Sequence, residues 1–113
     1  MKYLCLVYME EHTLAQVSDS ECKAYGDGLR ESGRWIDGAA LQPVHTATTV
    51  RVRNGKVTMT DGPFAETKEQ LAGFYLIDAK DLDEAIDIAG KLPAGRWGTV
   101  EIRPVVEVAG LPS

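Results

Sequence analysis

The chain contains, almost at its beginning, the run Tyr3-Leu4-Cys5-Leu6-Val7-Tyr8-Met9, seven residues without a charge. A run so short and so apolar, without strict alternation, is typical of a β-strand that is buried on both faces. We therefore expect both sides of the sheet that contains this strand to be covered. Cys5 lies within the run, and we expect it to be a small buried hydrophobic residue in a reducing compartment.

Two helices are predicted by capping sequences and by the spacing of apolar residues. Ser18-Asp19-Ser20-Glu21 resembles a capping box, and Gly33 provides a stop for the helix that follows it. Asp81-Leu82-Asp83-Glu84 resembles a second capping box, and Pro93 closes its helix. Each helix carries an apolar stripe at helical spacing, formed by Cys22, Tyr25 and Leu29 in the first and by Leu82, Ala85, Ile86, Ala89 and Leu92 in the second.

The clearest strand pattern lies between residues 46 and 60, where Val50, Val52, Val57 and Met59 alternate with polar residues. Asn54-Gly55 in its middle favours a type I′ turn, so residues 48–53 and 56–60 are predicted to pair as a hairpin whose polar face meets water. Three other strands are expected at residues 35–41, with a bulge at Gly38, at residues 71–77, and in the alternating segment 100–108.

The resulting order is strand, helix, strand, hairpin, strand, helix, strand, within one domain that spans residues 1–113. Two βαβ-type halves separated by a hairpin predict an α+β fold with a ferredoxin-like antiparallel sheet and both helices on one face. The other face of the sheet would expose the apolar opening strand. We therefore expect two such sheets to pack face to face in an isologous homodimer.

Composition and charge exclude several classes of function. Seventeen acidic and twelve scattered basic residues give a formal charge of −5, so nucleic acid is not an expected partner. No apolar run approaches the roughly 18 residues of a membrane span, and the early strand leaves no room for a signal peptide, so we expect a cytoplasmic protein without a membrane partner. Metal-ligand spacing and a glycine-rich phosphate loop are both missing, so no metal or other cofactor is expected.

A specific motif lies between the hairpin and the next strand, Asp61-Gly62-Pro63-Phe64-Ala65-Glu66-Thr67-Lys68-Glu69-Gln70. Together with Leu41-Gln42-Pro43, Gly73-Phe74-Tyr75-Leu76-Ile77 and Glu101-Ile102-Arg103-Pro104, it resembles the DGPF-domain branch of the YCII-related superfamily over nearly the whole chain. The resemblance implies a dimeric α+β barrel, a fold shared with muconolactone isomerase-like proteins and small monooxygenases, and a cleft between sheet and helices. It implies no particular reaction.

The wider superfamily has a histidine on the first helix and an aspartate after the second, on which enzymatic activity has been inferred. The comparable positions here fall at Cys22 and at or beside Leu92. Neither a thiol nor a leucine replaces an imidazole–carboxylate pair at neutral pH, so acid–base catalysis is not carried over. His12 and His45, both in predicted loops, are more simply interpreted as solvated side chains.

Two classes of function follow from these residues. The first is a small enzyme without a cofactor that acts on a small organic acid in the barrel cleft, with weak catalytic candidates at Asp61, Glu66, Lys68 and Cys22. The second is a non-catalytic ligand-binding, regulatory or protein-interaction module, for example one associated with a sigma factor. The predicted ligand-binding residues for a small organic molecule are Asp61, Phe64, Glu66, Lys68 and Arg103.

Each of these residues also has a structural interpretation. Asp61 could form a turn by bonding nearby backbone amides, and Phe64 could anchor its loop to the core. Glu66 and Lys68 could pair on a solvated surface, as could Arg103. Gly73 would leave space either for a ligand or for a second backbone, or mark a bulge, which is the commoner cause.

Overall fold

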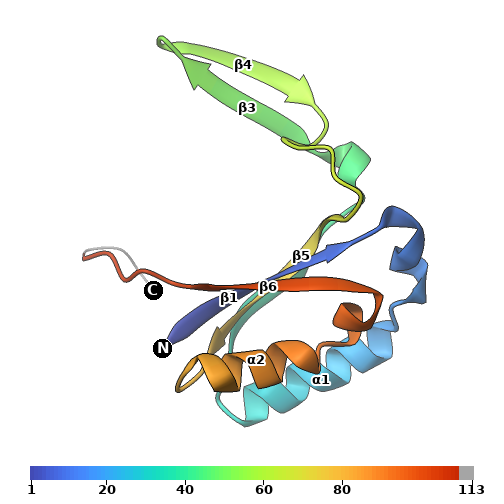
Figure 1. Cartoon of the computed structure of the whole chain (residues 1–113), viewed down its shortest axis with the longest axis vertical. Coiled ribbons are helices and arrows are strands. Elements are labelled where there is room, and N and C mark those ends of the chain that lie inside the picture. The colour runs from blue at the N-terminus through green and yellow to red at the C-terminus, as the bar shows by residue number, and fades with distance from the viewer. Residues whose placement is uncertain (110–113) are drawn as a thin grey trace.

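The computed structural model describes residues 1–109 and has an α+β architecture, as predicted. One sheet is covered by two helices, and a separate hairpin extends away from it (Figure 1). The α-helices and strands are β1 (Lys2–Met9), α1 (Asp19–Glu31), β2 (Trp35–Ala40), β3 (Thr48–Arg53), β4 (Lys56–Asp61), β5 (Gln70–Asp78), α2 (Leu82–Gly90) and β6 (Gly98–Pro104). Short 3₁₀ helices occupy Glu11–Gln16, Val44–Thr46 and Pro93–Trp97.

The main sheet has the strand order β2-β5-β1-β6, and every neighbouring pair is antiparallel. β1 is central, so Cys5 lies opposite Tyr75 of β5 on one side and Ile102 of β6 on the other. Both helices cover the same face of this sheet (Figure 1). The sheet is open at β2 and β6, and within residues 1–109 no barrel closes, so a barrel would require a second chain.

The core follows from the two-residue period of β1. Tyr3, Cys5, Val7 and Met9 are buried beneath the helices, while the intervening Leu4, Leu6 and Tyr8 are only half-buried. The prediction that β1 is buried on both faces is therefore wrong for the single chain. The physical reason is that the helices supply one apolar layer, and no element among residues 1–109 supplies a second.

The predicted helix caps are confirmed. The backbone N–H of Glu21 donates to Ser18 Oγ at 3.3 Å, and that of Glu84 donates to Asp81 Oδ1 at 2.9 Å. The reciprocal half of the first capping box is not formed, because the Glu21 carboxylate pairs instead with Arg96. Glu84 pairs with Arg34 at 3.0 Å, which ties the segment after α1 to the start of α2 and lowers the pKa of the Glu84 carboxyl through the hydrogen bond from Arg34.

Two strand predictions need correction. β6 ends at Pro104 rather than near residue 108, because its partner β1 begins at Lys2 and offers nothing to pair with beyond that point. The irregularity in β2 lies between Trp35 and Asp37 rather than at Gly38. Gly38 is required for another reason, since a Cβ there would lie 2.7 Å from the Trp35 ring.

The hairpin forms as predicted. Thr48–Arg53 pairs with Lys56–Asp61, and Asn54 and Gly55 have the positive φ angles of 53° and 74° that a type I′ turn requires. β3 and β4 make a two-stranded sheet of their own that projects from the body of the molecule (Figure 1). All six residues of β4 are exposed.

Gly73 allows β5 to approach β2 closely. The pairing of β5 with β1 is also irregular beside it, where Val7 lies opposite Gly73 and Tyr8 opposite Leu71, so the close backbone approach and the expected bulge both occur there. A Cβ there would lie 2.8 Å from the carbonyl oxygen of Ala39. We predict that Gly73→Ala lowers the free energy of unfolding by about 1–3 kcal/mol, because backbone must shift to admit the methyl group. Urea denaturation measures the change.

Gly28→Ala is the matched control for that substitution. Gly28 lies within α1, and a Cβ there would meet no atom within 4 Å. The substitution Gly28→Ala should raise the free energy of unfolding by about 0.5–1 kcal/mol, because alanine is more stable than glycine in a helix interior. Equal stability of Gly73→Ala and the unmodified protein would contradict the close approach.

Candidate functional site

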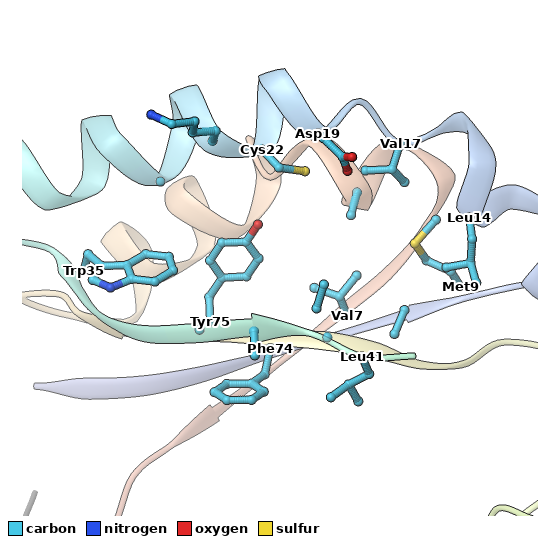
Figure 2. A pocket seen from close by; sticks show the side chains of 18 of the residues that line it. Val7, Met9, Leu14, Val17, Asp19, Cys22, Trp35, Leu41, Phe74 and Tyr75 are labelled. Carbon is cyan, nitrogen blue, oxygen red and sulfur yellow. The ribbon is translucent and has the colours of Figure 1, made fainter. Parts of the chain in front are cut away.

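A cleft of about 470 Å³ lies between α1 and the sheet (Figure 2). Val7 and Met9 of β1 and Tyr75 of β5 line its floor, and Asp19 and Cys22 of α1 line its opposite wall. Figure 2 shows Phe74 directed away from this space, toward the other face of the sheet. The cleft is therefore on the helix-covered face, where the family resemblance places it.

The cleft exists because the elements around it carry small side chains. Gly38, Ala39 and Ala40 follow one another in β2, and Ala72 and Gly73 lie beside them in β5. Larger residues at these positions would fill the space between sheet and helix. On the helix side, Gly26 of α1 lines the cleft and has no side chain to fill it.

Three polar side chains meet at one part of the cleft. The sulfur of Cys22 and the hydroxyl of Tyr75 point toward each other from α1 and β5, and Asp19 lies one turn before Cys22 (Figure 2). Burial, followed by the negative charge of Asp19, raises the pKa of the Cys22 thiol above its ordinary value, although the hydrogen bond with Tyr75 opposes this. Burial and the neighbouring Cys22 raise the pKa of Tyr75.

Both shifts move the pKa further above neutral pH, where the ordinary pKa values of a thiol and a phenol already lie. A thiol and a phenol with raised pKa values are both protonated there, so each has a hydrogen to donate to an acceptor in the cleft. The nucleophilic form of cysteine is the thiolate, whose population at Cys22 is reduced by the same shift. The arrangement is suited to recognition of an acceptor oxygen rather than to nucleophilic attack. Cys5 is fully buried, and burial raises the pKa of its thiol to about 11, as expected for a core residue.

An aromatic wall borders the cleft. Trp35 meets Tyr75 edge to face, with ring centroids 5.7 Å apart and planes at 90°. The Arg30 guanidinium carbon lies 4.2 Å from the Trp35 ring centroid, and its Nη1 donates to Asp27 at 3.0 Å. These contacts fix the indole in place, so the wall is preformed.

The family model of the YCII-related domain matches residues 1–109. The chain belongs to the YCII-related family. It is also similar to an uncharacterized protein of Rhizobium meliloti (strain 1021), with 40% identity over 114 residues that cover 93% of this chain and 92% of the relative. The family assignment made from the Asp61–Gln70 motif and its companion segments is thus confirmed.

In this YCII-related protein, the residues predicted to form a site lie in separate places. Cys22 lines the cleft, but Glu66 and Lys68 border a second, more open hollow of about 660 Å³ beneath the motif loop. Lys68 pairs there with Glu10 at 3.2 Å, and the exposed His12 lies 3.3 Å from the same glutamate. The hollow is lined by charged and polar side chains for the most part.

The remaining predicted residues line neither space. Asp61 is the exposed last residue of β4, and its side chain makes no hydrogen bond within residues 1–109, so the predicted turn bond is absent there. Phe64 is 76% exposed and contacts Arg51, with 5.3 Å between guanidinium carbon and ring centroid, so it does not anchor the loop to the core of this chain. Arg103 lies on β6 and pairs with Glu101 at 3.3 Å.

Sequence reasoning missed Asp19 and Tyr75. The available signal was the pair of small-residue runs in two strands that the topology makes neighbours, Gly38-Ala39-Ala40 and Ala72-Gly73. Leu92, at the position compared with the family aspartate, is buried in the core. Within residues 1–109, no group of side chains suited to hold a metal ion occurs, and neither α-helix has the length and apolarity to cross a membrane.

We predict that Cys22 is the thiol that iodoacetamide alkylates in the folded protein, with a pH–rate midpoint above that of a short unstructured cysteine peptide. Asp19→Asn should lower this midpoint, because it removes a negative charge that disfavours the thiolate. Tyr75→Phe should raise it, because the hydrogen bond with Tyr75 lowers the pKa of Cys22. Mass spectrometry of the labelled peptides, with Cys22→Ser as control, measures the rates.

A Cys22 midpoint at or below that of the peptide would contradict the assignment of the thiol as a hydrogen-bond donor. An unchanged midpoint in Asp19→Asn would also contradict the described geometry, because it would mean that the Asp19 carboxylate is too far from Cys22 to affect the pKa of its thiol.

Proposed function

We propose that this YCII-related protein binds a small, largely apolar organic molecule in the cleft between α1 and the sheet. The observation that carries the proposal is the facing pair of protonated donors, Cys22 and Tyr75, within a space that is otherwise lined mainly by apolar and small residues. A carbonyl or carboxylate oxygen of the ligand would accept hydrogen bonds from both groups. The molecule is held without a covalent bond to the protein.

The size and composition of the cleft support this ligand class. Its volume of about 470 Å³ falls within the roughly 300–1,000 Å³ typical of small-molecule sites. Val7, Met9 and Leu14 provide apolar contacts, and Trp35 provides a fixed aromatic wall for a planar group. The hollow beneath the motif loop has fewer apolar walls and opens more widely to water, so the cleft is the better candidate.

We further propose that two chains pack through the uncovered face of the main sheet, as in a dimeric α+β barrel. The strand order β2-β5-β1-β6, with both helices on one face, is that expected of a ferredoxin-like domain and supports this assembly. Leu6 of β1 lies opposite Phe74 of β5 on this face, and Leu4 lies opposite Leu76. A continuous apolar sheet face of this kind would favour aggregation unless another sheet covered it.

A thermal-shift screen against small organic acids and cyclic metabolites should give compounds that raise the melting temperature, because such compounds bind only the folded state. A compound bound in the cleft should also slow alkylation of Cys22. We predict that Tyr75→Phe weakens its binding about three- to tenfold, the effect of one lost hydrogen bond. Lys68→Ala, in the second hollow, is the control and should leave the affinity unchanged.

A compound whose affinity falls in Lys68→Ala but not in Tyr75→Phe would move the site to the motif loop. A complete absence of stabilising compounds in the screen would count against ligand binding. Any stabilising compound is then incubated with the protein and analysed for turnover, which separates an enzyme from a binding protein.

For the dimer, we predict that Leu6→Lys raises the dissociation constant at least about 100-fold, because an unpaired ammonium in an apolar interface costs several kcal/mol. Leu82→Lys is the matched control, since Leu82 is exposed on α2 and lies away from the sheet. Sedimentation equilibrium measures both constants, and circular dichroism shows whether each variant is folded. Equal dissociation constants for the two folded variants would contradict the sheet-to-sheet contact.

A further inference from the structure

The hairpin formed by β3 and β4, here termed the arm, has one apolar face and one polar face. The register pairs Val50 with Met59 and Val52 with Val57, so these four side chains lie together on one face. They are 56–74% exposed. The opposite face carries Arg51, Arg53 and Lys56, as the sequence pattern predicted.

The arm packs against no other strand or helix within residues 1–109. In that part of the chain its two strands pair only with each other, and every residue of β4 is exposed. A lone two-stranded hairpin is at best marginally stable in water. The radius of gyration is 15.7 Å, whereas a compact domain of this length would have roughly 13 Å. Figure 1 shows the arm projecting from the body of the molecule.

The size of the apolar surface fits a dimer contact. The four side chains of the apolar face expose on the order of 400 Å² of apolar surface, comparable with the largest patch that a typical monomer leaves uncovered. A stable interface buries roughly 800 Å² on each partner. The arm therefore supplies about half of such an interface, and the uncovered face of the main sheet can supply the other half.

The positive charge of the arm favours a negatively charged partner. Residues 48–61 contain Arg51, Arg53, Lys56 and one carboxylate, Asp61, a net charge of +2 in a chain of net charge −5. The remainder of the chain thus carries −7. A cationic arm is attracted to an acidic body, and another copy of this chain offers that body together with an uncovered apolar face.

We propose that each arm docks its apolar face on a second copy of the chain, so that the two arms clasp the dimer. This inference rests on the proposed dimer and adds a second contact to it. The arm is inserted between the two halves of the domain, and none of its residues belongs to the hydrophobic core described within residues 1–109. Its role is to bury its apolar face against the partner and to extend the interface beyond the sheets.

The test compares Met59→Lys with Thr60→Lys by sedimentation equilibrium of the full chain. The two residues are adjacent in β4, but Met59 lies on the apolar face and Thr60 on the polar face. We expect Met59→Lys to raise the dissociation constant of the dimer at least tenfold and Thr60→Lys to change it less than twofold. Neither position belongs to the core, so the melting temperature of the main domain under monomeric conditions should stay the same in both variants.

Photo-crosslinking provides the second measurement. A benzophenone amino acid at position 59 should give a covalent dimer of the purified chain, and the same group at position 60 should give much less. If Met59→Lys dimerises as tightly as the unmodified protein and position 59 gives no covalent dimer, the arm does not clasp a second copy. If Leu6→Lys nevertheless dissociates the dimer, the sheet contact stands and only the arm proposal falls. If the unmodified protein sediments as a monomer, both fall.

Discussion

β1 carries apolar side chains on both of its faces, and the elements described within residues 1–109 cover only one of those faces. Tyr3, Cys5, Val7 and Met9 face the helices, and their burial forms the centre of the core. Because side chains alternate along a strand, Leu4, Leu6 and Tyr8 must then face the other way. Both helices lie on one face of the sheet, so within residues 1–109 the other face stays uncovered. The uncovered face, the proposed dimer and the position of the cleft all follow from this constraint.

The cleft depends on the same sheet. Most of the helix-covered face is filled by large side chains, but beside β2 the residues are glycine and alanine, so α1 does not close down on the strands. Cys22 and Tyr75 meet across this space, and partial burial raises the pKa of both groups and so favours their protonated forms. Cys22 is a weak acid, and the role proposed for this part of the cleft is recognition of an acceptor oxygen.

Local sequence signals predicted most of the fold. The caps at Ser18 and Asp81 and the Asn54-Gly55 turn depend on a few neighbouring residues, so their structure could be read directly. The end of β6 at Pro104 could not be predicted from neighbouring residues, because it depends on where β1 begins, about a hundred residues away. The burial of β1 was overestimated for a related reason, since apolar composition does not say whether the covering layer comes from the same chain.

The site was less predictable. Charged motif residues such as Glu66 and Lys68 drew attention, yet they border an open hollow, and Phe64 is exposed rather than packed inward. The cleft is marked by what is missing, namely side-chain volume at Gly38 and Gly73 in strands that are distant in sequence but paired in the sheet. Only the topology brings those positions together, which is why Cys22 was found by comparison with the family and Tyr75 was not found at all.

In the proposed dimer, a second copy of the chain covers the surfaces that one chain leaves exposed. Hydrogen–deuterium exchange of the backbone amides, measured over a range of protein concentrations, tests this most directly. The account predicts that the amides of β3 and β4 are protected at high concentration and lose protection on dilution as the dimer dissociates, while the β1–β5 ladder stays protected. Protection of the arm that is the same at every concentration, whether strong or absent, would contradict it.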